Sequence, residues 1–329
     1  MIHIIKLIRY KNLILIAFLQ LVMHRIVIVP ILQIHGFDAN SWDDGFFALL
    51  TLATVFIAAG GYVLNDYFDM KIDAINHPEA QIVGKHLERS KAMILHQILT
   101  AIGTAIGLGL ALFTKSFTLA FIFIVVPGLL WFYSASYKRQ FMIGNLTVAF
   151  ICMITVLIVG IAQIKLLEIQ YDKLIYQTPI PSMIYSWIGG FGFFAFFITW
   201  IREIIKDMAD ETGDREMECR TMPIVWGTTK TKVVIYAIII FTLVALFFIE
   251  ESWIHFEGDM TLQYLLYGIL APFIVLSYLV FKSKTAEEYH QASTLCKYIM
   301  IIGIMYSFVF NFLEAKLHGL ALFDLFLIK

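Results

Sequence analysis

Long apolar segments alternate with short polar stretches along nearly the whole chain. Segments of about 20 mainly apolar residues have the length that an α-helix needs to cross a bilayer. A tight helical hairpin is expected where only Thr114 and Lys115 separate two such segments, and the terminal stretch 314–329 is expected at the membrane interface. The pattern predicts an all-α integral membrane bundle of nine transmembrane helices, near residues 12–32, 44–64, 92–113, 116–136, 142–164, 183–205, 230–249, 261–281 and 297–313.

Composition supports a membrane protein and excludes an ordinary soluble domain. The 329 residues are 60% hydrophobic and 15% charged, and the mean hydropathy is +0.81. Soluble domains are roughly 45–50% apolar and about 25% charged. The net charge of −1 does not by itself indicate a partner, and no nucleic-acid partner is expected. Basic residues precede the first apolar segment without a small-residue cleavage site, so this segment is interpreted as an uncleaved first span.

The basic residues predict how the bundle is oriented. If the N-terminus is cytoplasmic, 18 of the 24 Lys and Arg residues fall on the cytoplasmic side. The positive-inside rule favours that orientation, and the acidic loop 250–260 then lies outside. We therefore expect a multi-pass protein of the cell (inner) membrane with a cytoplasmic N-terminus.

Three carboxylates appear where the second apolar segment ends. Asp66, Asp69 and Asp73 have the spacing i, i+3, i+7, which places them on one face of a helix, and Asn65 borders that face. Like charges on one face repel each other, so the arrangement favours a bound cation. Carboxylate oxygens suit Mg²⁺, which commonly binds a substrate phosphate as well. A solvated helix end is the alternative interpretation of this cluster taken alone.

The sixth apolar segment ends in a second cluster with the same spacing, at Asp207, Asp210 and Asp214. Both clusters fall on the predicted cytoplasmic side, so we expect two helix ends that face each other. Six aspartates exceed the charge of one divalent ion, which predicts two or more Mg²⁺ ions and, in turn, a bound anion. Basic side chains able to contact a diphosphate lie beside the second cluster, although each is also explained by membrane topology: Arg202, Lys206 and Arg220.

These motifs resemble those of the UbiA superfamily of intramembrane prenyltransferases. Asn65-Asp66-x-x-Asp69-x-x-x-Asp73 is similar to the first aspartate motif of the family, and Asp207-x-x-Asp210-x-x-x-Asp214 is similar to the second. The sequence Arg-Glu-Ile-Ile-Lys-Asp, which leads into the second motif and ends at its first aspartate, resembles most the branch that prenylates glycerol-phosphate lipids. The resemblance extends over residues 9 to about 310 through smaller pieces, which are Arg9-x-x-Asn12, Tyr133 with Lys138-Arg139, Gly144-Asn145 and Thr221-Met222-Pro223.

The resemblance implies a single prenyltransferase domain over residues 1–329. Its expected activity is Mg²⁺-dependent transfer of an isoprenyl group from a polyprenyl diphosphate, such as geranylgeranyl or farnesyl diphosphate, to a lipid-soluble or interfacial acceptor. The donor would ionise to an allylic carbocation inside an apolar bundle. The implied metal ligands are Asp66, Asp69, Asp73, Asp207, Asp210 and Asp214, with Asp66, Asp69, Asp207, Asp210, Tyr133 and Lys138 as catalytic residues and Asn12, Asn65, Arg202, Lys206 and Arg220 as substrate-binding residues.

One departure from the family pattern follows the first motif. Family members often carry an arginine after the Asn-x-Pro there, but this chain reads Asn76-His77-Pro78-Glu79-Ala80-Gln81. Lys85 and Arg89 are the candidates to replace that arginine. Two alternatives stay open at this point: an ion-coupled transporter, against which stands the lack of acids at span centres, and a catalytically inert, lipid-binding relative.

Overall fold

The chain folds into a bundle of long helices, seen in a computed structural model that describes residues 2–37, 41–76, 78–79, 81–254, 256–322 and 326–327. Nine helical segments among these residues are long and apolar enough to cross a membrane. The prediction of a nine-span all-α membrane protein is therefore confirmed. The spans are Tyr10–Ile34, Asp43–Asn76, Arg89–Phe113, Phe117–Ala135, Ile143–Gln177, Ile180–Ala209, Thr228–Trp253, Met260–Lys282 and Ala286–His318.

The first and eighth spans each contain a short π-helical stretch, in which each backbone hydrogen bond spans one residue more than in an α-helix. Short 3₁₀ helices and a two-stranded antiparallel pair complete the structure. The elements are α1 (Ile2–Leu7), α2 (Tyr10–Val22), η1 (Met23–Ile28), α3 (Val29–Ile34), α4 (Ser41–Asn76), α5 (Arg89–Phe113), α6 (Phe117–Ala135), η2 (Tyr137–Arg139), α7 (Ile143–Tyr171), η3 (Asp172–Gln177), α8 (Ile180–Ala209), α9 (Glu211–Glu216), α10 (Met222–Trp226), α11 (Thr228–Trp253), α12 (Met260–Gln263), η4 (Tyr264–Leu270), α13 (Ala271–Lys282), α14 (Ala286–His318), β1 (Ala321–Leu322) and β2 (Phe326–Leu327).

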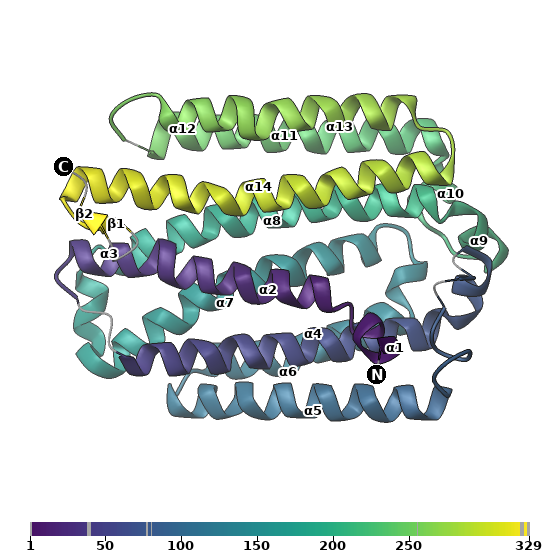
Figure 1. Ribbon diagram of the computed structural model, residues 1–329, viewed down its shortest axis with the longest axis horizontal. Coiled ribbons are helices and arrows are strands. Elements are labelled where there is room, and N and C mark those ends of the chain that lie inside the picture. Colours follow the sequence, from purple (N-terminus) through teal and green to yellow (C-terminus); the bar gives the residue numbers. More distant parts are fainter. Residues whose placement is uncertain are drawn as a thin grey trace.

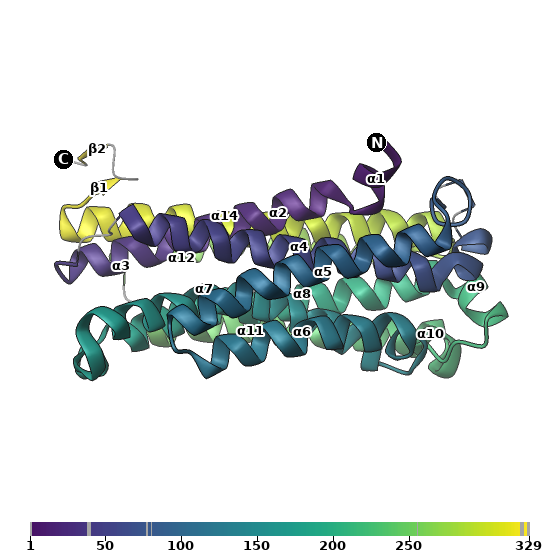
Figure 2. The ribbon, with the colours of Figure 1, turned by 90° about the horizontal axis from the view of Figure 1, so that it is seen from below.

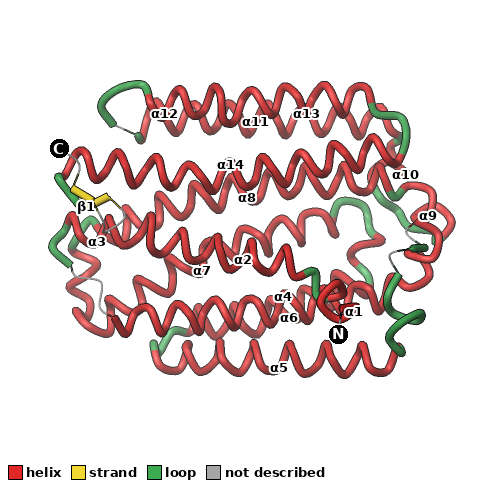
Figure 3. The backbone as a smooth tube through the Cα atoms, in the orientation of Figure 1, coloured by secondary structure: helices red, strands yellow, loops and turns green. Residues whose placement is uncertain are grey.

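The long helices run side by side, so the connecting segments gather at the two ends of the bundle (Figures 1 and 3). One end holds α1, α9 and α10, and the opposite end holds α3 and the C-terminal strands. The view turned by 90° shows the same separation (Figure 2). Because α4 and α8 both finish near α9, this arrangement brings the two aspartate motifs to one end.

Close helix packing depends on small residues at defined positions. A Cβ atom added at Gly103 of α5 would lie 2.7 Å from the carbonyl oxygen of Ala53 in α4. Such a distance is far below van der Waals contact, so only glycine permits this approach. Helices in a membrane associate mainly through this kind of packing, because lipid tails are as apolar as the side chains.

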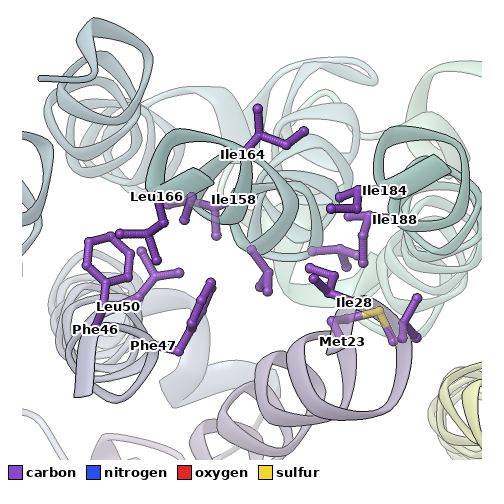
Figure 4. Close-up of a cluster of buried hydrophobic side chains, with 14 of the residues drawn as sticks. Met23, Ile28, Phe46, Phe47, Leu50, Ile158, Ile164, Leu166, Ile184 and Ile188 are labelled. Atoms are coloured by element: carbon purple, nitrogen blue, oxygen red, sulfur yellow. The ribbon is translucent and has the colours of Figure 1, made fainter. Parts of the chain in front are cut away.

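The apolar core has two main parts, one away from the aspartate motifs and one that packs α8 against α11, α13 and α14 as far as Met208 and Ala209, beside the second motif. The first part joins η1, α4, α7 and α8 through tightly packed side chains, several of which are labelled in Figure 4. Met23 and Leu50 are fully buried there, and Ile158 and Ile188 are nearly so. The bundle also contains a cavity, described below.

The last helix is longer than the span expected from the sequence. That span was expected near residues 297–313, whereas α14 runs from Ala286 to His318; the interfacial position of 314–329 stays a prediction. The helix then ends at Gly319, which adopts a left-handed conformation (φ 66°) that glycine tolerates best.

Candidate active site

The ends of α4 and α8 are joined by direct hydrogen bonds. Asn76, the last residue of α4, donates its Nδ2 to the backbone oxygen of Asp210 at 3.2 Å. Its Oδ1 accepts a hydrogen bond from the backbone N–H of Gly213 at 3.0 Å. The expectation that the two aspartate-bearing ends face each other is confirmed.

The second aspartate cluster does not lie on one continuous helix, contrary to the helical spacing that we expected. Helix α8 ends at Ala209, Asp210 lies between the helices, and the separate short helix α9 begins at Glu211 and carries Asp214. Glycine at position 213 permits the close approach of Asn76, because a Cβ there would lie 2.5 Å from the Asn76 Oδ1. Asp214 is therefore positioned by a contact between distant segments as well as by local helix geometry.

The carboxylate of Asp69 is the most buried acid of the first motif, with a side chain only 3% exposed. It accepts a 2.7 Å hydrogen bond from Asn65 Nδ2, one helical turn earlier in α4. It also forms an ion pair with Lys138, from η2 between α6 and α7. Two groups from separate segments therefore hold this carboxylate in place.

Asp66 is paired with a residue from the N-terminal segment. The guanidinium Nη2 of Arg9 lies 3.0 Å from its Oδ1, and the same guanidinium lies 5.0 Å from the ring centroid of Tyr62. Arg9 has a left-handed backbone (φ 52°) at the junction of α1 and α2, which is uncommon for a residue with a long side chain. Arg9 was part of the resemblance, but its pairing with Asp66 was not foreseen.

The second motif has its own polar partners. Asn145, near the start of α7, donates Nδ2 to the Asp207 carboxylate at 2.9 Å. Arg202 pairs with Glu203 beside it, and the buried Nε–H of Arg202 has no acceptor among the described residues. The Gly144-Asn145 pair was the sequence signal that could have identified Asn145 as a positioning residue for Asp207.

The carboxylates fit a hard divalent cation by their chemistry. Burial raises the pKa of Asp214, which lies outside the spans, to about 6, so its ionised form lacks sufficient stabilisation. Within the described part of the chain, no three acids, histidines or cysteines are grouped closely enough to hold a metal ion. Instead the protein's own Arg9 and Lys138 supply positive charge to the first motif. An oxygen-only set of this kind suits Mg²⁺.

A cavity of about 340 Å³ extends from the aspartate motifs into the apolar half of the bundle. Asn12, from α2, donates a 3.3 Å hydrogen bond to the Tyr62 hydroxyl at the polar end of this cavity. Its interior is lined mostly by aliphatic and aromatic side chains. The polar and charged residues of the lining that lie nearest the motifs are Arg9, Asn12, Tyr62, Asn65, Tyr133, Arg202, Glu203, Lys206 and Lys297.

Most of the predicted substrate-binding residues line this cavity, but Arg220 does not. The Arg220 side chain is exposed and forms no hydrogen bond or ion pair within the residues described, while its backbone N–H donates to the Arg139 oxygen at 2.8 Å. The roles assigned to all of these side chains stay predictions. Tyr62 and Lys297 are polar lining residues that the sequence did not single out, because neither belongs to a recognisable motif.

The structure gives no contact between the aspartates and the two candidates for the missing arginine. Lys85 donates to the Pro78 carbonyl at 2.6 Å, and the Arg89 guanidinium lies 4.4 Å from the Tyr67 ring centroid. His77 and Ala80 of the altered stretch lie outside the described residues. Neither Lys85 nor Arg89 has a described bond to a motif aspartate.

Comparison with known proteins gives the family of the chain. The UbiA prenyltransferase family model matches residues 27–307. The digeranylgeranylglyceryl phosphate synthase of Methanosphaera stadtmanae is 31% identical over 78% of this chain and 83% of its own length. The synthase of the same name from Sulfolobus acidocaldarius is 29% identical over 91% of this chain and 98% of its own.

Solved structures share the fold at low sequence identity. A structure described as giving insights into digeranylgeranylglyceryl phosphate synthase in membranes has a TM-score of 0.61 and 21% identity, covering 95% of this chain and 98% of the other. A UbiA homologue from Aeropyrum pernix has a TM-score of 0.63 and 13% identity, with coverage of 89% and 98%. The predicted intramembrane prenyltransferase is thereby confirmed, and the transporter alternative is set aside. This chain belongs to the UbiA prenyltransferase family.

Proposed function

We propose that this protein transfers a geranylgeranyl group from its diphosphate to a geranylgeranylglyceryl phosphate, yielding digeranylgeranylglyceryl phosphate. The names of the similar synthases support this choice of product. The observation that carries the proposal is the cavity itself, in which Arg9, Arg202, Glu203, Lys206 and Lys297 from several helices line one end of an otherwise apolar space, next to Asn65 of the first motif. This combination suits a substrate with a charged head and a long apolar tail.

The diphosphate would bind at the polar end of the cavity. A UbiA homologue from Archaeoglobus fulgidus has been solved with GPP and Mg²⁺ bound. Two or more Mg²⁺ ions, held mainly by Asp66, Asp69, Asp207 and Asp210 with Asp73 and Asp214 in support, would neutralise the charge that develops on the leaving diphosphate. Lys206 forms no ion pair within the described residues, so its ammonium is available to the phosphate oxygens.

The unpartnered Nε–H of Arg202 adds a second donor for phosphate. A buried donor without an acceptor is unfavourable, and an anionic oxygen in the cavity would remove that cost. Tyr133, also in the lining, would lie near the reacting carbon. The apolar walls exclude water, which would otherwise capture the allylic carbocation before the acceptor hydroxyl forms the new C–O bond.

The length of the cavity agrees with a donor of three to four isoprene units. Along α4, Thr54 at its far end is twelve residues from Asp66. That separation is a little over three helical turns of about 5.4 Å each, and one extended isoprene unit is close to one such turn in length. The donor tail can therefore lie along α4 without leaving the bundle.

Lys297 of α14 is suited to the phosphate of the acceptor. Its ammonium lines the same cavity and forms no ion pair or hydrogen bond with the described residues. Its nearest charged neighbours include the guanidinium groups of Arg202 and Arg9, each already paired with an acid. A phosphate near Lys297 would balance this local excess of positive charge.

The location that fits this chemistry is the cell membrane, with the N-terminus and both aspartate motifs on the cytoplasmic side. The excess of basic residues on that side supports the orientation. A diphosphate head group is soluble in the cytoplasm, and the cavity would admit it there.

The proposal is tested with the purified protein in detergent, labelled geranylgeranyl diphosphate, the prenylglyceryl phosphate acceptor and Mg²⁺. We expect Asp66→Asn and Asp207→Asn each to lower transfer by at least about 10²-fold, the scale for loss of one electrostatic contact in an active site. The control Asp259→Asn, at an exposed acid in a loop, should leave transfer unchanged. Full activity in either motif variant, or undiminished transfer in EDTA, would refute the metal-dependent reaction.

A further inference from the structure

The cavity ends at the same depth on three helices. Its lining reaches Leu19 on α2, Thr54 on α4 and Ile158 on α7, and goes no deeper on those helices. Beyond this level the packed core begins, where Phe47 and Leu50 fill the space between the helices (Figure 4). Something therefore closes the cavity at this depth.

Gln20 of α2 cross-links the three helices at that closed end. Its Nε2 donates to Thr54 Oγ1 at 3.3 Å and to the backbone oxygen of Thr155 at 3.1 Å. Both threonines line the cavity. The Gln20 side chain lies behind them and is only 2% exposed, so it fills the position that a longer cavity would need.

The cross-link carries an energetic cost. The Oε1 of Gln20 has no hydrogen-bond partner among the described residues although it is buried. An unpaired amide oxygen in apolar surroundings costs more than an aliphatic side chain of similar size would.

We propose that Gln20 is a specificity-determining residue that sets the longest isoprenyl chain this enzyme accepts. The proposal rests on the function proposed above, because it concerns the donor of that reaction. With Gln20 in place, the cavity lining ends at Leu19 on α2 and at Thr54 on α4. Without its side chain, the cavity gains space in line with the bound tail.

The test compares donors of four and five isoprene units in the same detergent assay. The Gln20→Ala variant should raise kcat/KM for the five-unit donor, relative to the four-unit donor, by at least about tenfold, as expected when space opens in an apolar pocket. Gln163→Ala is the matched control, since Gln163 is also fully buried in the membrane region but lies on α7 eight residues beyond Thr155, away from the lining threonines that Gln20 contacts. That variant should keep the wild-type ratio. If Gln20→Ala does not fold, Gln20→Val removes part of the same volume and should shift the ratio in the same direction.

Three results bear on the proposal. Gln20→Leu keeps the volume and loses the hydrogen bonds, so it should retain the wild-type ratio. An unchanged ratio in folded Gln20→Ala, or an equal shift in Gln163→Ala, would overturn the assignment of the limit to Gln20. If the wild-type protein transfers neither donor, the proposed function fails instead.

Discussion

Lys138 forms an ion pair with Asp69, an expected metal ligand. We therefore predict that Lys138 and a bound metal ion both neutralise the charge of this carboxylate. The Lys138 side chain is 21% exposed and that of Asp69 is 3% exposed. Burial by itself lowers the pKa of Lys138, but the carboxylate of Asp69 and the phenol of Tyr133 outweigh it and raise the pKa. The ammonium therefore stays charged, and Lys138→Met removes one full charge from beside a buried acid.

The surroundings of Asp69 determine how much Lys138→Met lowers the free energy of unfolding. Removing one partner of a buried ion pair costs about 3–5 kcal/mol, because the other charge is left without compensation. Asn65 still donates to Asp69 in the variant, so the lower end of this range, about 3 kcal/mol, applies. For a chain longer than 250 residues, about 2 °C per kcal/mol converts this into a fall in melting temperature of roughly 6 °C.

Thermal unfolding in detergent, with EDTA or with Mg²⁺, checks this prediction. In EDTA, Lys138→Met should melt below the wild-type protein. Saturating Mg²⁺ should raise its melting temperature more than that of the wild type, because the ion supplies the charge that Lys138 no longer provides. Prenyl transfer should fall by about 10²-fold if Lys138 contacts the diphosphate, as the resemblance implies.

The matched control is Arg139→Met, which removes the same charge from the neighbouring exposed residue and should leave all three measurements nearly unchanged. Equal melting temperatures for Lys138→Met and the wild type in EDTA would show that the ion pair does not stabilise the first motif. An equal response to Mg²⁺ in both proteins would show that Lys138 and the ion do not share Asp69.

Two further predictions concern the acceptor and the helix packing. Lys297→Met should raise KM for the phosphate-bearing acceptor by about tenfold, the effect of losing one charge-assisted contact, and leave KM for the donor unchanged. The exposed Lys282→Met is the control, and an equal loss of donor affinity would contradict the assignment. Gly103→Ala should destabilise the protein by about 1–3 kcal/mol, because its Cβ would collide with the α4 backbone. Gly109→Ala, where nothing lies within 4 Å, should not lower the melting temperature, and equal melting of the two variants would argue against tight α4–α5 packing.

The sequence by itself determined the spans and the chemical character of the site. A transmembrane helix satisfies its own backbone hydrogen bonds, so about 20 apolar residues define it without reference to the rest of the chain. The spacing Asp66, Asp69 and Asp73 is likewise local, and α4 carries all three as expected. The same rule failed for the second motif, because α8 ends at Ala209 and Asp214 lies on α9, which hydrogen bonds to Asn76 hold against the end of α4.

Only the tertiary structure decided which side chains meet across the bundle. Gln20 lies 34 residues from Thr54 and 135 from Thr155, and Asn145 lies 62 residues from Asp207. Nothing in the residues next to Gln20 or Lys297 indicates a site, because neither belongs to a motif in the sequence. Local sequence fixes where a helix begins and ends, but the rotation of one helix against another follows from packing over the whole bundle. That packing brought Asn145 to Asp207 at one end of the bundle and Gln20 to the cavity-lining Thr54 and Thr155 deeper inside it.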